Sequence, residues 1–473
     1  MTEIFEMISS SKSQLMKKFS SFISFALALL VSIATARAAN KPNIIIIMAD
    51  DLGYGDLGCY GHPTIRTPNL DRMAAEGLRF TDFYAGQSLC TPSRAALMTG
   101  RLPLRSGMAG GPGRHVLYPN HPGGLPQDEI TIAEALKEKG YATGMVGKWH
   151  LGDMPGYLPT DNGFDFFFGL PYSNDSDWVK TEYRKTENLS RDPVEGRFNV
   201  PLVRQTNIIE RPAVQSILTK RYTEEAIHFM EQNKKNPFFL YFPHTFPHVP
   251  VFVSEKFKNK SLRGRYGDTV EELDWSVGEV LNWLRKEKLE KNTFVFFLSD
   301  NGPWLDKKWN GGSAGLLRDG KAGTWEGGYR VPGLAHWPGK IAPGVTHDIA
   351  SAMDLFATSL KLGGASLPKD RAIDGIDMTP LLFNGKPHRD TQFYYYGDQL
   401  YAVRHGKYKA HFITHDGYSK EPHIKHETPL LFDLGEDPSE KFNLASDYPK
   451  VIAEIKQRAE AHTANIRTAK PQF

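Results

Sequence analysis

Residues 43–51, "NIIIIMADD", combine an unbroken apolar run with two adjacent carboxylates. Apolar, β-branched residues without polar alternation are typical of a strand buried on both faces, as in parallel sheets. The run ends at Asp50 and Asp51. Three further apolar runs contain or precede polar residues in the same way: 141–146 before Lys148 and His150, 238–243 before His244 and His248, and 293–302 with Asp300 and Asn301.

Helical patterns separate these runs, at 68–76, 131–139 and 270–288. Alternating strands and helices predict an α/β domain with a large, mixed, mostly parallel sheet flanked by helices. In such sheets, ligands bind beyond the carboxyl ends of the strands. We therefore expect the polar residues that follow the four runs to meet at one site.

The pattern of residue types changes near residue 390. "TQFYYYG", "LYAVRHGKYKAHFI" and "PLLFDLGEDPSE" alternate aromatic and polar residues around turn signals, which predicts a small antiparallel sheet. A final helix is expected near 447–465 and should pack on this sheet. The predicted organisation is a catalytic domain at 39–385 and a C-terminal α+β subdomain at 386–473.

The N-terminal segment carries an export pattern. Lys17 and Lys18 precede an apolar stretch that ends in the small-residue pattern Ala36-Arg37-Ala38, which is typical of a secretory signal peptide over 1–38. A membrane anchor is the alternative, but Ser and Thr residues interrupt the stretch. We expect a secreted or periplasmic protein without stable membrane insertion. The net charge of +3 also gives no reason to expect a nucleic-acid partner.

The 473 residues include only two cysteines, Cys59 and Cys90, so no disulfide framework is expected, although the two could pair once. Cys90 opens "CTPSRAALMTGR", in which Pro92 suits a first helical turn and Gly100 the position after the last. A helix N-terminus favours anions. Such a position could activate a thiolate or hold an anionic substrate, and the pattern alone leaves both open.

Asp50, Asp51, Asp300 and Asn301 would supply hard oxygen ligands from the ends of two strands. This set suits Ca²⁺ or Mg²⁺ and not zinc, which prefers His and Cys. Either pair alone is more often a turn or a helix cap. Two pairs at buried strand ends favour a cation, because uncompensated carboxylates packed together are costly.

Cations and histidines accompany these acids. "GKWHLG" places Lys148 and His150 two residues apart, and "RDGKAGTWEGGYRVP" presents Lys321 in a glycine-rich loop that can approach a ligand closely. Together with Arg94, these groups would surround a doubly negative group beside a metal ion. The arrangement is typical of ester hydrolysis at sulfur or phosphorus.

At this point a family resemblance is apparent. "CTPSRAALMTGR" resembles the signature of type I sulfatases, in which the cysteine is oxidised to formylglycine (3-oxoalanine). The segments "GKWHLG", "GLPYSNDSD", "TFPHVP", "LSDNG" and "GKAGTWEGG" follow in the family's order. The similarity is to the arylsulfatase A-like branch and runs from about residue 42 to "PLLFDLGEDPSEKFNL".

The resemblance implies an alkaline-phosphatase-like fold and one bound Ca²⁺. It assigns the metal ligands to Asp50, Asp51, Asp300, Asn301 and the modified Cys90. It assigns to Arg94 and Lys148 the orientation and stabilisation of formylglycine and sulfate. His150 corresponds to the base that expels sulfate.

The resemblance also implies the residues on the leaving-group side. His248 matches the leaving-group position better than His244, and Lys321 matches a sulfate-binding lysine near the leaving oxygen. Ser173 matches a serine of the site, whereas Asn174 stands where that branch carries His. Further substrate contacts are expected from His244, His423 and His426, with His115 as another candidate, and from loops at 105–122, 155–210 and 410–428. For His115, His423 and His426, a solvated side chain is the alternative.

The function implied is a secreted sulfatase that hydrolyses a sulfate ester through a formylglycine sulfate-ester intermediate. The substrate would be an aryl sulfate in vitro and a sulfated carbohydrate in nature. A formylglycine-generating enzyme, or an equivalent maturase, is the implied partner. Two alternatives are a phosphodiesterase or phosphonate monoester hydrolase on the same scaffold, and a non-catalytic sulfoglycan-binding protein. The sequence leaves the oligomeric state open.

Overall fold

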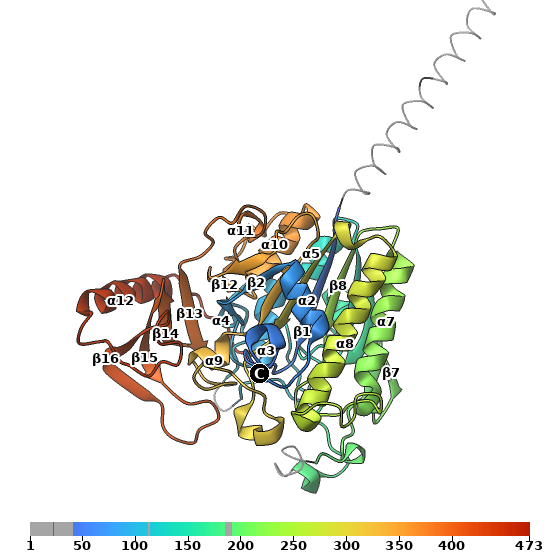
Figure 1. The fold of residues 1–473 in the computed structure, drawn as a ribbon, viewed down its shortest axis with the longest axis horizontal. Helices are drawn as coiled ribbons and strands as arrows, with labels where there is room; N and C mark the ends of the chain where they lie inside the picture. The colour runs from blue at the N-terminus through green and yellow to red at the C-terminus, as the bar shows by residue number, and fades with distance from the viewer. Residues whose placement is uncertain (1–21, 23–40, 112–113, 185–191) are drawn as a thin grey trace, which may run out of the picture.

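The computed structural model describes residue 22 and residues 41–111, 114–184 and 192–473 (Figure 1). The predicted signal peptide at 1–38 therefore lies outside the described residues, apart from Phe22. Within the described ranges, no helix has both the length and the apolar character that crossing a bilayer requires.

A ten-stranded mixed sheet forms the centre of the larger domain (Figure 1). Its strands, in spatial order, are β11 (Gly344–Thr346), β2 (Leu78–Phe80), β10 (Gly333–His336), β9 (Thr293–Ser299), β1 (Asn43–Ala49), β8 (Phe238–Pro243), β4 (Ala142–Lys148), β5 (Phe166–Leu170), β6 (Leu202–Arg204) and β7 (Asn207–Glu210). The five strands from β9 to β5 are mutually parallel, whereas β10 and β6 run antiparallel to their neighbours. The predicted fold class is confirmed.

The four apolar runs identified in the sequence are consecutive strands of this sheet. β1 pairs in parallel with β8 on one side and β9 on the other, in the registers Ile45↔Leu240 and Ile45↔Val295. Every residue of β1 is buried. Because the four strands run in the same direction, the polar residues after them emerge at one edge of the sheet.

Helices cover both faces of the sheet, and β1 shows why its residues are apolar throughout. Ile45 and Ile47 belong to a core shared with α2 (Pro68–Glu76), α7 (Leu218–Asn233) and α8 (Gly264–Lys286). Ile44 and Ile46 belong to the opposite core, shared with α3 (Cys90–Thr99), α5 (Ile132–Lys137) and α10 (Asp354–Gly363). The domain therefore has three layers, α/β/α (Figure 1).

Helix α3 carries the segment that opens with Cys90. Leu89 precedes it in an extended conformation, and Gly100 ends it with φ of +67°, the left-handed conformation that favours glycine. All ten residues of α3 are buried. The predicted helix start at Cys90 is therefore present, and it lies inside the molecule.

The C-terminal residues form a separate four-stranded antiparallel sheet beside the larger domain (Figure 1). Its strands are β13 (Thr391–Tyr396), β14 (Gln399–His405), β15 (Tyr408–Thr414) and β16 (Ile424–Asp433). The final helix α12 (Pro449–Ala464) packs on this sheet through Ile452 and Ile455 against Val403 and Leu431. Both features agree with the sequence-based expectation.

The remaining elements of the described residues are short. β3 (Phe83–Tyr84) pairs with β12 (Ala350–Ser351), and the short α-helices are α4 (Pro103–Ser106), α9 (Glu326–Tyr329) and α11 (Thr379–Asn384). The 3-10 helices are η1 (Gly58–Tyr60), η2 (Pro159–Asn162), η3 (Thr181–Arg184), η4 (Glu195–Arg197), η5 (Gln215–Ile217), η6 (Glu290–Asn292) and η7 (Leu305–Asn310).

Candidate active site

The carboxyl ends of β1 and β9 bring the predicted acidic residues together. The amide of Asp51 donates to Asp300 Oδ1 at 3.1 Å, and Asn301 Nδ2 donates to Asp51 Oδ1 at 2.7 Å. These three residues and Asp50 are each 3 % exposed or less. Adjacent parallel strands therefore hold the two pairs, far apart in sequence, in direct contact.

Three buried cations lie against these acids. Arg94, from the first turn of α3, pairs with Asp300 at 2.9 Å and with Asp50 at 3.5 Å. Lys148, the last residue of β4, places Nζ 2.5 Å from Asp50 Oδ2. Lys321 contacts Asp51 Oδ1 at 2.6 Å. We call Asp50, Asp51, Asp300, Arg94, Lys148 and Lys321 the site cluster.

The charges of the site cluster shift the acidity of its members in opposite directions. Burial raises the pKa of Asp300 to about 7, and Asp50 adds to the rise while Arg94 opposes it. Burial also raises the pKa of Asp51, against the effect of Lys321. The pKa of Asp50 is held below its usual range, because Lys148, His248 and Arg94 together outweigh the effect of burial.

The donor set fits a hard divalent cation. Asp50 Oδ1 and Asn301 Oδ1 are buried and have no hydrogen-bond partner among the described residues. Ligand atoms of Asp50, Cys90 and Asp300 lie within 4.8 Å of one another. Unpaired carboxylate and amide oxygens are what Ca²⁺ and Mg²⁺ bind, so the residues present match the predicted metal site.

Cys90 lies beside this group and is 2 % exposed. Burial raises the pKa of its thiol, although Lys148 and Lys321 act in the other direction. A thiol nucleophile needs a lowered pKa. Of the two roles that the sequence left open for the helix start, anion binding is therefore the one compatible with this environment. Cys59 and Cys90 are both free cysteines.

His150 lies two residues after the end of β4 and lines the same pocket as Cys90. Its backbone adopts φ of +65°, which is uncommon for a residue with a side chain. Nε2 lies 2.9 Å from the carbonyl of Leu117, while Nδ1 is buried without a partner among the described residues. Burial, Lys148 and Arg94 lower the pKa of His150, so the imidazole is neutral near pH 7 and can accept a proton.

His248 is oriented by a residue for which the sequence gave no role. Its Nδ1 lies 3.1 Å from Asn174 Oδ1, while Nε2 is 3.4 Å from Ser173 Oγ and 3.7 Å from Asp51 Oδ2. Asn174 is fixed in turn, because its Nδ2 donates to Gln215 and to the carbonyl of Pro250. Asn174 is thus a positioning residue for His248, not a wall of the pocket.

Four of the six predicted catalytic side chains line one pocket of about 260 Å³, whereas Arg94 and Lys148 lie behind its lining. Its lining includes Cys90, His150, His248, Lys321 and Ser173. Ser173 Oγ also accepts from Lys148 Nζ at 3.3 Å. The pocket therefore places cationic and imidazole side chains next to the start of α3.

Comparison with known proteins identifies this constellation. The model of the sulfatase family matches residues 42–365, and that of the C-terminal region of aryl-sulfatase matches 387–473. The chain belongs to the sulfatase family. It is an enzyme that hydrolyses sulfate esters.

Individual relatives agree with this assignment. Arylsulfatase A of Bos taurus is 46 % identical over 92 % of this sulfatase and 89 % of its own length. N-acetylgalactosamine-6-sulfatase of Mus musculus is 41 % identical over 94 % and 90 % of the two chains. Among solved structures, the sulfatase PsFucS1 of Pseudoalteromonas sp. has a TM-score of 0.80 at 30 % identity, covering 93 % of this chain and 94 % of its own.

Three predicted substrate contacts of the sulfatase do not reach the pocket lining. His244 is fully buried, with its ring 4.3 Å from Phe242 and 6.4 Å from Tyr222 of α7, and it does not line the pocket, so its contact with substrate stays a prediction. The chain turns after β8, and this directs His244 into the core and His248 into the pocket.

His423 and His426 are the other two. His423 stacks on His415 with ring centroids 3.8 Å apart, and His426 Nε2 lies 2.9 Å from Thr414 Oγ1. His426 belongs to β16 and His423 lies just before it, and neither lines the pocket around Cys90, so their contact with substrate stays a prediction. His115 packs against Tyr396, with ring centroids 5.0 Å apart.

The pocket also contains side chains that sequence reasoning did not single out. Each of the three loops expected to set specificity contributes lining residues: Val116, Tyr118, Asp175, Ser176, Trp178, Arg184 and Tyr418. A fourth segment adds Trp304. Asp175 and Ser176 lie within the family segment "GLPYSNDSD", so the sequence could have pointed to them. The only signal for the others is membership of long loops rich in aromatic and polar residues.

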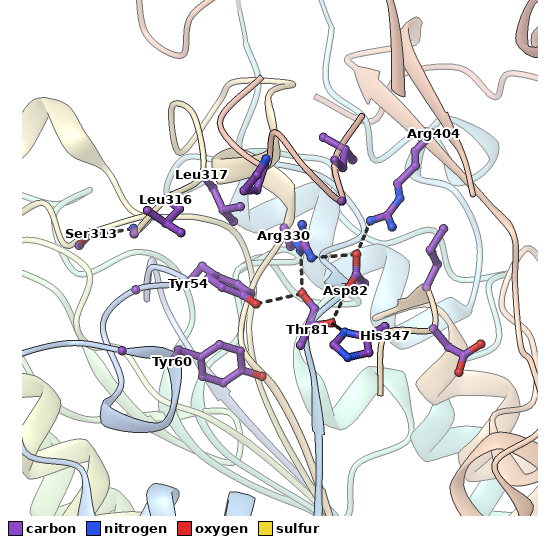
Figure 2. Close-up of a pocket in the computed structure, with 18 of the residues that line it drawn as sticks. Tyr54, Tyr60, Thr81, Asp82, Ser313, Leu316, Leu317, Arg330, His347 and Arg404 are labelled. Carbon is purple, nitrogen blue, oxygen red and sulfur yellow. Dashed lines mark hydrogen bonds and ion pairs between the residues drawn. The ribbon is translucent and has the colours of Figure 1, made fainter. Parts of the chain in front are cut away.

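A larger cleft, of about 1380 Å³, is lined by residues of both the larger domain and the C-terminal sheet, among them Arg330 and Arg404 (Figure 2). Its floor includes Asp82, which points toward both Arg330 and Arg404 (Figure 2). Behind it, Lys409 Nζ lies 3.0 Å from both Glu326 Oε1 and Glu440 Oε1. We call Asp82, Glu326, Glu440, Arg330, Arg404 and Lys409 the junction cluster. Its three acids and three cations neutralise one another, in contrast to the unpaired oxygens of Asp50 and Asn301 beside the smaller pocket.

Proposed function

We propose that this sulfatase is exported, carries formylglycine at position 90, binds one Ca²⁺ and removes sulfate from a sulfated carbohydrate. The observation that carries the proposal is the position of Cys90. Its thiol is buried at the start of α3, burial raises its pKa against the charges of Lys148 and Lys321, and it lines a pocket with Lys321, His150 and His248. These surroundings suit a doubly negative sulfate and disfavour a thiolate.

Oxidation of Cys90 to an aldehyde would supply, as its hydrate, the hydroxyl that attacks sulfur. Arg94, at hydrogen-bond distance from the Lys148 carbonyl, and Lys148 itself lie where they can neutralise charge on the nucleophile and the sulfate. His150 is neutral and offers a base for the second hydroxyl. Both roles follow the family resemblance of these residues.

On the opposite side, Lys321 can neutralise the leaving oxygen, whereas His248 can donate to it only after Nε2 has taken up a proton, because burial and Lys321 lower the pKa of His248. The Asn174 contact holds His248 Nδ1, which leaves Nε2 toward the pocket beside Ser173. Lys321 is 3 % exposed and keeps its charge, because Asp51 holds its pKa above the ordinary range despite burial. A leaving alkoxide would therefore meet a fixed positive charge.

The metal would be held by Asp50, Asp51, Asp300 and Asn301, with residue 90 adjacent. When bound, Ca²⁺ would stabilise negative charge on the sulfate oxygens and on the hydroxyl at position 90. The two unpartnered oxygens, Asp50 Oδ1 and Asn301 Oδ1, support this ligand set.

The decisive experiment has two readouts. Mass spectrometry of the peptide that spans Cys90, from protein made in its native host, should show the loss of mass from thiol to aldehyde. The same preparation should hydrolyse 4-nitrophenyl sulfate in clear preference to 4-nitrophenyl phosphate. An unmodified cysteine in fully active protein would reject the nucleophile, and a preference for phosphate would favour a phosphate or phosphonate hydrolase.

A further inference from the structure

The wall of the catalytic pocket includes a stacked aromatic pair drawn from both domains. Trp304 follows β9, and Tyr418 lies in the loop between β15 and β16. Their rings are 4.9 Å apart and inclined by 26°. Both residues line the pocket with Cys90, His248 and Lys321. The C-terminal domain thus reaches the reaction centre with one side chain.

Trp304 connects this pair to the leaving-group side of the site. Its ring centroid lies 5.7 Å from that of His248 and 4.7 Å from Lys321 Nζ. Lys307 Nζ also lies 4.0 Å from the same ring. These contacts occupy much of the indole surface, so Trp304 acts as a backing for Tyr418. Tyr418 is 42 % exposed and offers the accessible ring.

The loop that carries Tyr418 is fixed to the loop that carries Lys321. Trp325 Nε1 donates to Asp416 Oδ1 at 2.8 Å, and the amide of Gly417 donates to Asp319 Oδ2 at 2.9 Å. A Cβ at position 417 would lie 2.1 Å from the carbonyl oxygen of Lys321, so only glycine allows this approach. Tyr418 is therefore held in place and not a freely moving loop residue.

The same pocket carries groups suited to hydroxyls. Asp175 and Ser176 line it, and Ser176 Oγ donates a long hydrogen bond of 3.4 Å to the Asp175 carboxylate. Trp304 Nε1 is buried without an acceptor among the described residues. Aromatic faces and carboxylates are chemically suited to the apolar C–H faces and the hydroxyl groups of a pyranose. A pocket of about 260 Å³ has room for one such ring next to the sulfate.

We propose that Tyr418, backed by Trp304, is the specificity-determining platform for the ring that bears the sulfate, and that Asp175 accepts hydrogen bonds from its hydroxyl groups. The substrate class is a sulfated saccharide whose sulfated ring stacks on Tyr418. The inference rests on the proposed function, since it concerns the leaving group of that reaction.

Three substrates separate the contributions: a sulfated hexosamine monosaccharide, 4-nitrophenyl sulfate, and ethyl sulfate, which has no ring. Tyr418→Ala should lower kcat/KM about 10-fold for both ring substrates, mainly through KM, and leave ethyl sulfate within about 2-fold. Tyr418→Phe keeps the ring and should lose much less than Tyr418→Ala on both ring substrates. Asp175→Asn should lower kcat/KM for the monosaccharide and leave 4-nitrophenyl sulfate unchanged.

An equal loss on all three substrates, or none on any, would overturn the platform. A binding measurement keeps this separate from the proposed chemistry. In calorimetric titrations of the Cys90→Ala protein, 4-nitrophenyl sulfate should bind about 10-fold more weakly when Tyr418→Ala is added. If that difference is present but the wild type hydrolyses no sulfate ester, the proposed function fails and the platform stands. Equal binding by the two proteins would reject the platform.

Discussion

The site cluster and the junction cluster are both buried groups of three acids and three cations, yet they differ in how completely their oxygens are paired. In the junction cluster every carboxylate oxygen has a donor. Glu326 accepts from Tyr84, Tyr394 and Lys409, and Glu440 accepts from Lys409, His411 and the Glu326 amide. Asp82 accepts from Thr81 and from the two arginines.

In the site cluster, Asp50 Oδ1 lacks a donor among the described residues, and so does the neighbouring Asn301 Oδ1. The pKa values of the carboxyl groups in the two clusters differ in the same way. Although burial alone would raise it, the pKa of Glu326 is lowered to about 2 by Lys409, Arg330 and Arg404, whereas burial raises the pKa of Asp300 to about 7. A satisfied cluster stabilises the fold, and an unsatisfied one is prepared to bind a ligand.

The strongest test of this comparison is Cys90→Ala beside the site cluster. Turnover of 4-nitrophenyl sulfate should fall by at least ~10⁴-fold, because the nucleophile is removed. The free energy of unfolding, from urea titration, should change by less than about 2 kcal/mol, because only a small side chain is lost. Cys59→Ala is the matched control and should keep full turnover. Activity of Cys90→Ala near that of the wild type would reject the assignment.

The junction cluster should respond in the opposite way to a single deletion. Lys409→Met leaves two buried carboxylates without their shared cation, and should cost about 3–5 kcal/mol of unfolding free energy. The control is Lys407→Met, which removes a half-exposed ion pair with Asp433 and should cost at most about 1 kcal/mol. A loss of similar size in both variants would show that the junction cluster has no special structural role.

Acid should separate the junction cluster further. The folded pKa of Glu326 is about 2, against an ordinary value of 4.5, so its contribution is complete above pH 4.5 and is lost as the pH falls toward 2. The full contribution is about 3 kcal/mol. In urea titrations, the stability difference between wild type and Glu326→Gln should shrink over that range. The exposed Glu427→Gln should show no such convergence, and a constant difference for Glu326→Gln would contradict the expectation.

The smallest expected difference in unfolding free energy between the two clusters is a response to calcium confined to the site cluster. Treatment with a chelator should abolish turnover, and Ca²⁺ at 100 times its dissociation constant should add about 2.7 kcal/mol to the unfolding free energy. Asn301→Ala should reduce this gain, whereas Lys409→Met should keep it. Full activity in metal-free protein that retains formylglycine would show that the metal role is wrong.

Much of the fold could be predicted because its strongest determinants are local. The run 43–49 has no polar residue after Asn43, and it forms the centre of the sheet. Helix α2 matches its predicted bounds, 68–76, because Pro68 and Gly77 delimit it. Helix α8 begins at Gly264, six residues before its predicted start at 270, because Tyr266 and its neighbours are buried by tertiary packing that helix propensity does not register.

The candidate site divides in the same way. Residues at strand ends, such as Asp50 and Asp300, could be placed because parallel strands share an edge. The choice between His244 and His248 depended on how the chain turns after β8, and spacing contains no such information. Tyr418 was beyond prediction as well, since its position depends on contacts between two domains.

The pairing of β1 has a consequence for the order in which the protein is made. Both neighbours of β1 come from much later in the chain, and the contact between Asp51 and Asp300 spans 249 residues. The centre of the sheet therefore cannot close until most of the larger domain has left the ribosome. Until then α3 lacks the sheet on which it packs, whereas all ten of its residues are buried in the folded protein. An enzyme that converts Cys90 to formylglycine would have to act within this interval, so the timing of synthesis would set the fraction of active molecules.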